Sequence, residues 1–185
     1  TVNETGRRRG KFLFTVYETG ESGVQRHNLR TGVTETVWQS APAGAVAFDA
    51  SYWTPWGTFI TAEEAWETRV GGSTLPYGRL FELKNPLTAP GIKGPLTATS
   101  NAGANFVHQN VIPRTSHEGI QFDAAGNMYF IDELNGGAIY KYTSAASLKA
   151  VKKGADYFAA GQTFVLRVGD GNTPNAVGAY TWVPI

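Results

Sequence analysis

Apolar and polar residues alternate with a period of two in several short segments of this chain, and turns rich in glycine separate these segments. Such alternation places apolar side chains on one face of a β-strand, so it predicts strands and not amphipathic helices. The pattern forms a hairpin three times. The expected strand pairs are 11–18 with 24–29, 57–64 with 78–83, and 126–133 with 137–142, and a further strand is expected at 35–39.

The second and third hairpins share one design. Their first strands superpose without a gap, from a leading glycine to a pair of adjacent acids, Glu63-Glu64 in one and Asp132-Glu133 in the other. The first hairpin matches more loosely and ends in Glu18. A repeated antiparallel unit of this kind is typical of a β-propeller, in which each blade repeats the same hairpin. The sequence therefore predicts an all-β chain folded as a β-propeller.

The length predicts an incomplete propeller. Blades of about 40 to 50 residues would give roughly three to four blades in this chain. Four is the low end for a closed ring, and the apolar segment 181–185 has no later strand to pair with. We expect residues 1–185 to be part of one propeller domain, with the missing blades elsewhere on a longer chain or on another chain that completes the ring.

Two stretches interrupt the strand pattern. The interval around 86–106 is rich in Pro, Ala, Thr, Gly and Asn, which predicts a loop insertion between blades. The interval around 144–158 has apolar residues at helical spacing and serines that can cap a helix, so it predicts a short helix. Residues 162–169 alternate again and predict one more strand.

Charge and composition limit the partners and the metal chemistry. The 16 Lys and Arg nearly balance the 15 Asp and Glu, so no basic field favours nucleic acid as a partner. No apolar run reaches the length of a membrane span. The chain has no cysteine, so any metal that it binds must be held by carboxylate, imidazole or carbonyl groups. Hard cations such as calcium, or a ferric or manganese centre, fit such ligands best.

The densest polar cluster is the segment 114–119, which reads Arg-Thr-Ser-His-Glu-Gly and comes directly before a predicted strand at 120–122. Residues just before the innermost strand of a blade lie at the mouth of the central channel. There the side chains of His117 and Glu118 could point at a shared ligand. Alternatively, both side chains form hydrogen bonds with turn amides, and the residues themselves leave these two interpretations open.

Two segments resemble the PhoX-type alkaline phosphatases. Residues 54–64 read TPWGTFITAEE and are similar to the family motif TPWGTWLTCEE, and residues 116–118, followed by a strand, a turn and an acid pair, resemble the second half of the family signature. The resemblance implies an exported enzyme with a six-bladed propeller. It also implies a centre of iron and calcium that hydrolyses small-molecule phosphate esters. A whole member of that family is much longer than 185 residues.

The sequence departs from the family pattern at three places. Asp49 stands where the family has a cysteine that binds iron, and Ala62 stands at the second cysteine of the pattern. The family's Glu-Asp pair appears here in the reversed order, as Asp132-Glu133. An aspartate can bind iron, but replacing a thiolate changes the charge and softness of the centre.

Carried over position by position, the resemblance implies a set of site residues. One acid of each adjacent pair should face the channel, because side chains alternate along a strand, and we favour Glu64 and Asp132 over their neighbours. Arg114 is the candidate for binding phosphate oxygens, since its guanidinium matches two of them. The expected catalytic residues are Arg114 and Glu118, and the expected metal ligands are Asp49, Glu63, Glu64, Glu118, Asp132 and Glu133.

Two other functions fit the sequence. The stretch from Glu118 to Asp132 is also similar to gluconolactonase-like propellers, in which a single calcium activates a lactone. A non-catalytic binding or assembly module would keep the propeller and lose the chemistry. Elemental analysis separates the phosphatase from the lactonase, because several metals including iron favour the phosphatase and one calcium favours the lactonase. The non-catalytic module predicts bound calcium at most, and no turnover.

Overall fold

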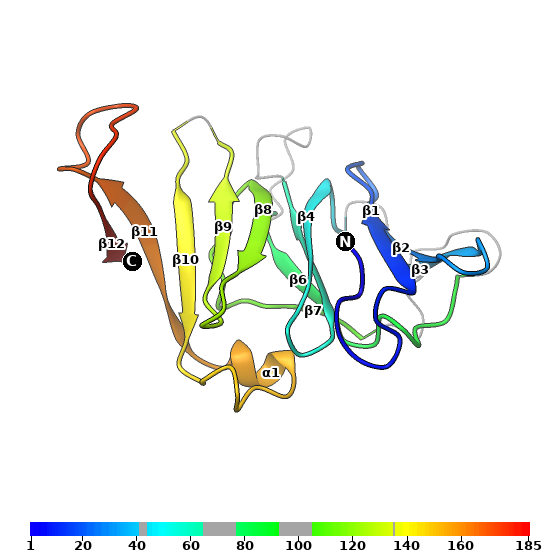
Figure 1. The fold of residues 1–185 in the computed structure, drawn as a ribbon. Helices are drawn as coiled ribbons and strands as arrows, with labels where there is room; N and C mark the ends of the chain where they lie inside the picture. Colours follow the sequence, from blue (N-terminus) through cyan, green and yellow to red (C-terminus); the bar gives the residue numbers. More distant parts are fainter. Residues whose placement is uncertain (41–43, 65–76, 93–104, 135) are drawn as a thin grey trace.

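The computed structural model describes residues 1–40, 44–64, 77–92, 105–134 and 136–185, which form three antiparallel sheets and one short helix (Figure 1). The elements are β1 (Phe12–Val16), β2 (Gly23–Asn28), β3 (Thr34–Gln39), β4 (Phe48–Trp53), β5 (Phe59–Glu63), β6 (Leu80–Leu83), β7 (Phe106–His108), β8 (His117–Phe122), β9 (Met128–Asp132), β10 (Ile139–Ser144), α1 (Gly154–Tyr157), β11 (Gly161–Val168) and β12 (Tyr180–Pro184).

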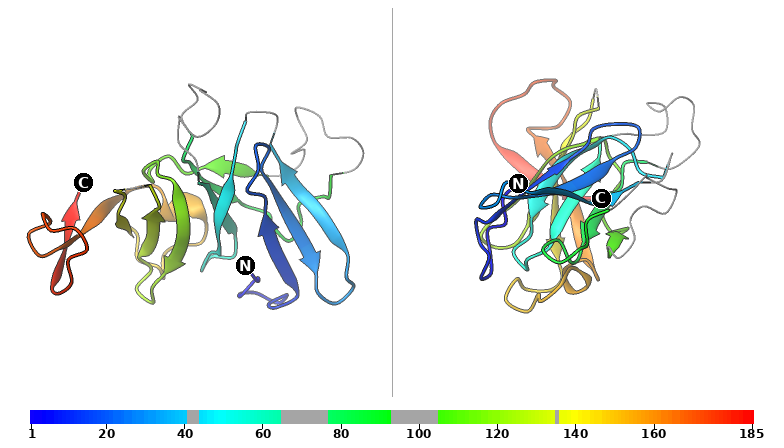
Figure 2. Two further views of the ribbon diagram at one scale, coloured as in Figure 1. Left: turned by 90° about the horizontal axis from the view of Figure 1, so that it is seen from above. Right: turned by 90° about the vertical axis from the view of Figure 1, so that its right-hand side faces the viewer.

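Each sheet follows the order of the chain. The first has the order β1-β2-β3, the second β4-β5-β6-β7 and the third β8-β9-β10-β11-β12. The first strand of the second sheet, β4, lies beside β8 of the third sheet and beside β1 of the first. The sheets therefore fan out as successive blades from neighbouring inner strands (Figure 2). The predicted all-β class and partial propeller are confirmed, and each of the three predicted hairpins lies in its own sheet.

Apolar side chains fill the spaces between successive sheets. One buried cluster joins the first and second sheets through residues such as Phe14, Trp38 and Phe48. The other joins the second and third sheets through residues such as Leu80 and Phe130. The middle sheet is covered on both faces, so β5 and β6 are buried at every position. Packing of this kind, sheet face against sheet face around an axis, is that of a propeller and not of a two-sheet sandwich.

Two strands were not expected from the sequence. In β4, Asp49 and Ser51 interrupt the apolar pattern, and β7 has only three residues. Both strands take their positions from backbone pairing, β4 with β5 and β7 with β6. At the other end of the chain, β12 forms the edge of the third sheet beside β11.

The two predicted interruptions lie as follows. Within the interval 144–158, the structure forms α-helix at Gly154–Tyr157, and β10 extends to Ser144. Of the predicted insertion at 86–106, residues 93–104 lie outside the described residues. Within the described part of the chain, no helix has the length and apolar character needed to cross a membrane.

The helix α1 is placed against a buried carboxylate of the middle sheet. Glu82, on β6, is fully buried and accepts hydrogen bonds from Trp56 Nε1 at 3.0 Å, Thr58 Oγ1 at 2.7 Å and Gln109 Nε2 at 2.6 Å. A Cβ atom added to Gly154 would meet the Glu82 carboxylate. Glycine is therefore required at the start of α1, because any side chain there would displace the carboxylate or the helix.

We predict that Gly154→Ala destabilises the protein by about 1–3 kcal/mol, the usual cost of forcing an extra carbon into a packed site. Chemical denaturation would measure the change. Gly20→Ala is the matched control, because a Cβ atom there meets nothing within 4 Å. A stability of Gly154→Ala equal to that of Gly20→Ala would contradict the prediction.

Candidate functional site

Three carboxylates from different strands meet at one place. Asp49 lies on β4, Glu64 directly follows β5, and Glu118 lies on β8. One oxygen from each lies within 4.8 Å of the other two. Glu64 is buried, and the other two are partly exposed. Because β4 and β8 are the neighbouring inner strands of two sheets, the group lies where these two blades meet.

A β-bulge positions Asp49 and another positions Glu118. In β4 the regular pairing with β5 breaks between Phe48 and Ser51, so that two residues oppose one. In β8 the same break with β9 occurs between His117 and Ile120. A bulge changes the direction of the side chains that it contains, and bulges occur often beside functional sites. Asp49 and Glu118 therefore occupy equivalent places in consecutive blades.

The second acid of each adjacent pair also has an equivalent place. The Glu64 backbone nitrogen donates to Ala47 O at 2.7 Å, and the Glu133 nitrogen donates to Ser116 O at 3.0 Å. Each bond ties the residue after the second strand of a sheet to the residue before the inner strand of the same sheet. Glu133 lies close enough to Glu118 to share a hydrogen bond with it. The site thus has two similar halves, each with one acid from a bulge and one acid after the next strand.

The first acid of each pair, Glu63 or Asp132, forms its contacts within its own blade. Asp132 Oδ1 accepts hydrogen bonds from the backbone nitrogens of Ser116 at 3.0 Å and Leu134 at 3.2 Å. Glu63 is fully buried and forms an ion pair with Arg79. Neither Glu63 nor Asp132 belongs to the group of three carboxylates. The sequence favoured Glu64 and Asp132 as the acids that face the channel. In the structure Glu64 belongs to this group, and Glu133, the neighbour of Asp132, lies beside Glu118.

Burial and the neighbouring acids together change the pKa of Glu118. Its pKa is raised above the ordinary value of 4.5, first by burial and then by the charges of Asp49, Glu133 and Glu64. Negative charges held this close repel one another unless a proton or a cation offsets them. The group is therefore arranged to bind positive charge.

The donor atoms decide which cation fits. Carboxylate oxygens are the usual ligands of calcium, and three of them within 4.8 Å of one another suit it. A thiolate-bound iron centre does not fit these 185 residues, because they contain no cysteine. Asp49 stands at the position where the resembled family has that thiolate, and it contributes an oxygen to the group.

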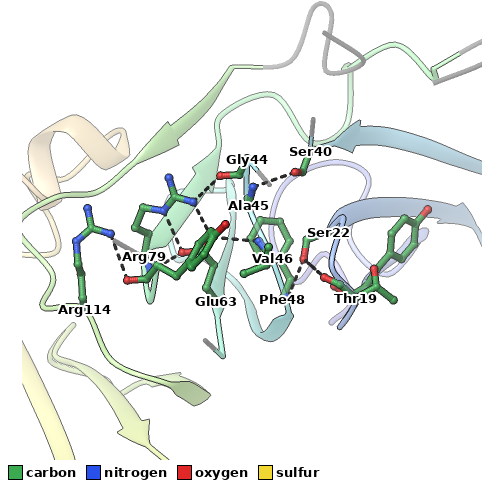
Figure 3. A network of polar contacts seen from close by, with 12 residues as sticks. Thr19, Ser22, Ser40, Gly44, Ala45, Val46, Phe48, Glu63, Arg79 and Arg114 are labelled. Carbon is green, nitrogen blue, oxygen red and sulfur yellow. Dashed lines mark hydrogen bonds and ion pairs between the residues drawn. The ribbon is translucent and has the colours of Figure 1, made fainter. Parts of the chain in front are cut away.

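Basic side chains lie beside the Glu63 ion pair. Arg114 donates from Nη1 to Tyr77 O at 3.3 Å, and Figure 3 shows it next to Arg79. Burial, followed by the Arg79 charge, lowers the pKa of the Arg114 guanidinium below its ordinary value. The pKa of His108 is lowered by burial and then by the charges of both arginines. The sequence indicated Arg114 but gave no signal for a role of Arg79 at the site, because it appeared only as a polar residue of the predicted strand 78–83.

His117 does not join the carboxylates, although it precedes Glu118. Its ring is fully buried against Phe130, with ring centroids 5.3 Å apart. Among the described residues, neither ring nitrogen has a hydrogen-bond partner of good geometry. Burial lowers the His117 pKa to about 4, and the nearby carbonyls of Gly78 and Pro113 oppose this shift only in part. The imidazole is therefore neutral at pH 7.

Comparisons with known proteins agree with this geometry. A family model described as alkaline phosphatase PhoX matches residues 24–185. Among solved structures, Pseudomonas fluorescens PhoX in complex with vanadate, a transition state analogue, superposes with a TM-score of 0.54 and 17% sequence identity. The match covers 88% of this chain and 40% of that chain, so the present chain spans less than half of its structural neighbour. No curated protein sequence matches the chain significantly.

We predict that Glu118→Gln makes the metal-free protein more stable at neutral pH. A carboxyl group whose pKa is raised on folding favours the folded state below pH 4.5, and this advantage is lost as the pH rises through the raised pKa. Glutamine cannot ionise, so the variant avoids this loss. Thermal unfolding in a chelator should show a higher midpoint for the variant at pH 7 and no gain below pH 4.5. Glu21→Gln, at an exposed position, is the control, and equal midpoints at pH 7 would contradict the prediction.

Proposed function

Because the chain belongs to the PhoX alkaline phosphatase family, we propose that it forms the cation-binding part of a phosphatase that hydrolyses small-molecule phosphate esters. The observation that carries the proposal is the convergence of Asp49, Glu64 and Glu118 within 4.8 Å. All three residues lie in the segment that matches the family model. The rest of the active site would come from further blades, on a longer chain or on a partner chain.

The carboxylate group would hold the cation. Asp49, Glu64 and Glu118 would be the ligands, and Glu133 would complete the set from beside Glu118. A calcium ion held there would supply positive charge to polarise phosphoryl oxygens and to activate water as a nucleophile. Such a cation would favour the charged form of Glu118, which burial and three neighbouring acids disfavour. Glu63 and Asp132 would support the site through the backbone.

Arg114 would bind the substrate phosphate. A guanidinium group carries five N–H donors, so the bond from Nη1 to Tyr77 O leaves capacity for two phosphate oxygens. The Tyr77 carbonyl fixes the direction of the side chain, and the partly buried position strengthens its interaction with an anion.

We propose calcium as the metal of this chain, with iron as a further metal only if ligands from outside these residues supply it. The support is the oxygen-only donor set. Because members of this family are exported, we propose that the protein is exported too and acts in the periplasm or outside the cell. A chain without cysteine is compatible with such an oxidising compartment.

Glu118→Gln tests the proposed function. The variant keeps the shape of the side chain but removes its charge, so we expect loss of calcium binding and of phosphatase activity with the fold retained. Isothermal titration with calcium and hydrolysis of p-nitrophenyl phosphate by the intact protein would measure both, with Glu21→Gln as the control. Full calcium content in the variant would refute the assignment. Lactone hydrolysis with a single calcium, or calcium binding without any turnover in the wild type, would favour the two other functions.

Arg114→Lys tests the phosphate contact. Lysine keeps the charge but cannot bind two oxygens in a fork, so we expect kcat/KM for p-nitrophenyl phosphate to fall by roughly 100-fold. Calcium affinity should not change, because Arg114 is not a ligand. Arg30→Lys, at an exposed turn, is the matched control. An unchanged kcat/KM in Arg114→Lys would exclude it from phosphate binding.

A further inference from the structure

We infer that Arg79 is a positioning residue for the carboxylate site, because its ion pair with Glu63 fixes both Asp49 and Glu64. The inference rests on the proposed cation site and names a residue that acts on it from outside. Arg79 directly precedes β6. Among the described residues, its side chain pairs with Glu63 and not with Asp49 or Glu64. Its effect is transmitted through the backbone on both sides of Glu63.

The ion pair occupies the whole carboxylate of Glu63. Arg79 Nε donates to Oε2 at 3.0 Å and Nη2 donates to Oε1 at 2.7 Å. The Arg79 backbone nitrogen also donates to Oε2, at 2.9 Å, and Val46 N donates to Oε1 at 3.2 Å. The side chain of Glu63 is completely buried. With Glu63 held in this direction, the alternation of the strand sends the next side chain, Glu64, to the other side.

The same pair holds the segment that leads to Asp49. Arg79 Nη2 donates to Gly44 O at 2.6 Å, while Glu63 accepts from Val46 N (Figure 3). Residues 44–46 are thus fixed by both members of the pair. Ala47 O then accepts from Glu64 N at 2.7 Å, and β4 begins at the next residue. The backbone that enters the Asp49 bulge and the backbone that carries Glu64 are therefore fixed by one ion pair.

Aromatic rings hold the guanidinium in place. The Arg79 guanidinium carbon lies 4.9 Å from the centre of the Phe81 ring and 5.7 Å from that of the Tyr77 ring. A planar guanidinium stacks on such rings and binds a carboxylate in a fork, whereas a lysine ammonium does neither. The geometry therefore requires arginine specifically.

The equivalent position in the third sheet shows why an arginine is needed here. Glu63 N donates to Arg79 O at 3.0 Å, and Asp132 N donates to Ala138 O at the same distance, so Ala138 is the counterpart of Arg79. The shorter Asp132 reaches the backbone nitrogen of Ser116 directly, at 3.0 Å. Glu63 is one methylene longer and fully buried, so its charge needs a cation as well as backbone donors.

The test compares Arg79 with an arginine of similar contacts outside the site. Arg26 pairs with Glu35 at 2.6 Å and donates to a backbone carbonyl, Pro86 O, at 2.9 Å. Calcium affinity of the intact protein would be measured by isothermal titration for Arg79→Lys and Arg26→Lys, with thermal unfolding of both in a chelator. We expect Arg79→Lys to weaken calcium binding by about 10-fold to 100-fold, as is usual for residues that orient metal ligands. Arg26→Lys should leave the affinity unchanged, although it too lowers stability.

Arg79→Met separates positioning from electrostatics. Removal of a positive charge near the site would by itself strengthen cation binding, whereas loss of positioning weakens it. Weaker binding in both Arg79 variants supports the inference. Unchanged or tighter binding in Arg79→Lys overturns it, as does an equal loss in Arg26→Lys, which would show that affinity only follows stability. Failure of the wild-type protein to bind calcium would instead refute the cation site, and with it the role of Arg79. Should Arg79→Met not fold, Glu63→Gln replaces it, with the same expected loss.

Discussion

Burial of the middle sheet on both faces is the constraint on which the rest of the structure depends. Every residue of β5 and β6 is buried, with Ile60 and Ala62 packed toward the third sheet and Phe59 toward the first. Removal of apolar surface from water is the main force that favours folding, and this sheet can be covered only if a sheet packs on each side. That packing brings β4 beside β1 and β8, so the inner strands of three blades become neighbours.

The carboxylate site is a consequence of that packing, which holds the carboxylates together although their negative charges repel one another. Apolar contacts between the blades bring Asp49 and Glu118 together, although burial and the charges of the neighbouring acids raise the pKa of Glu118. In each acid pair, the first residue forms contacts within its own blade, Glu63 with Arg79 and Asp132 with backbone nitrogens, and the second lies near the point where the blades meet. This division leaves a compact set of oxygens for a cation.

The two halves of the site achieve the same backbone geometry by different means. In the third sheet a short side chain, Asp132, binds the backbone nitrogen before the inner strand directly. In the second sheet Glu63 accepts from Val46 N, two residues before the inner strand, and also pairs with Arg79, because a buried charge needs a partner of opposite sign. The repeat is thus preserved in the backbone, where hydrogen bonds define it, and differs in the side chains that enforce it.

Local sequence determined most of the strands, the three hairpins and the two acid pairs, because alternation and turn residues act over a few neighbouring positions. It also indicated Glu118 and Arg114 through their place before a strand, and a resemblance to the family added Asp49. It did not reveal β4, whose position comes from pairing with β5, or the two bulges that turn Asp49 and Glu118 toward each other. Nor did it show that Glu133, and not Asp132, lies beside Glu118, or that Arg79 pairs with Glu63. Those features depend on contacts between residues far apart in the chain, and only the packing of complete sheets decides which of them form.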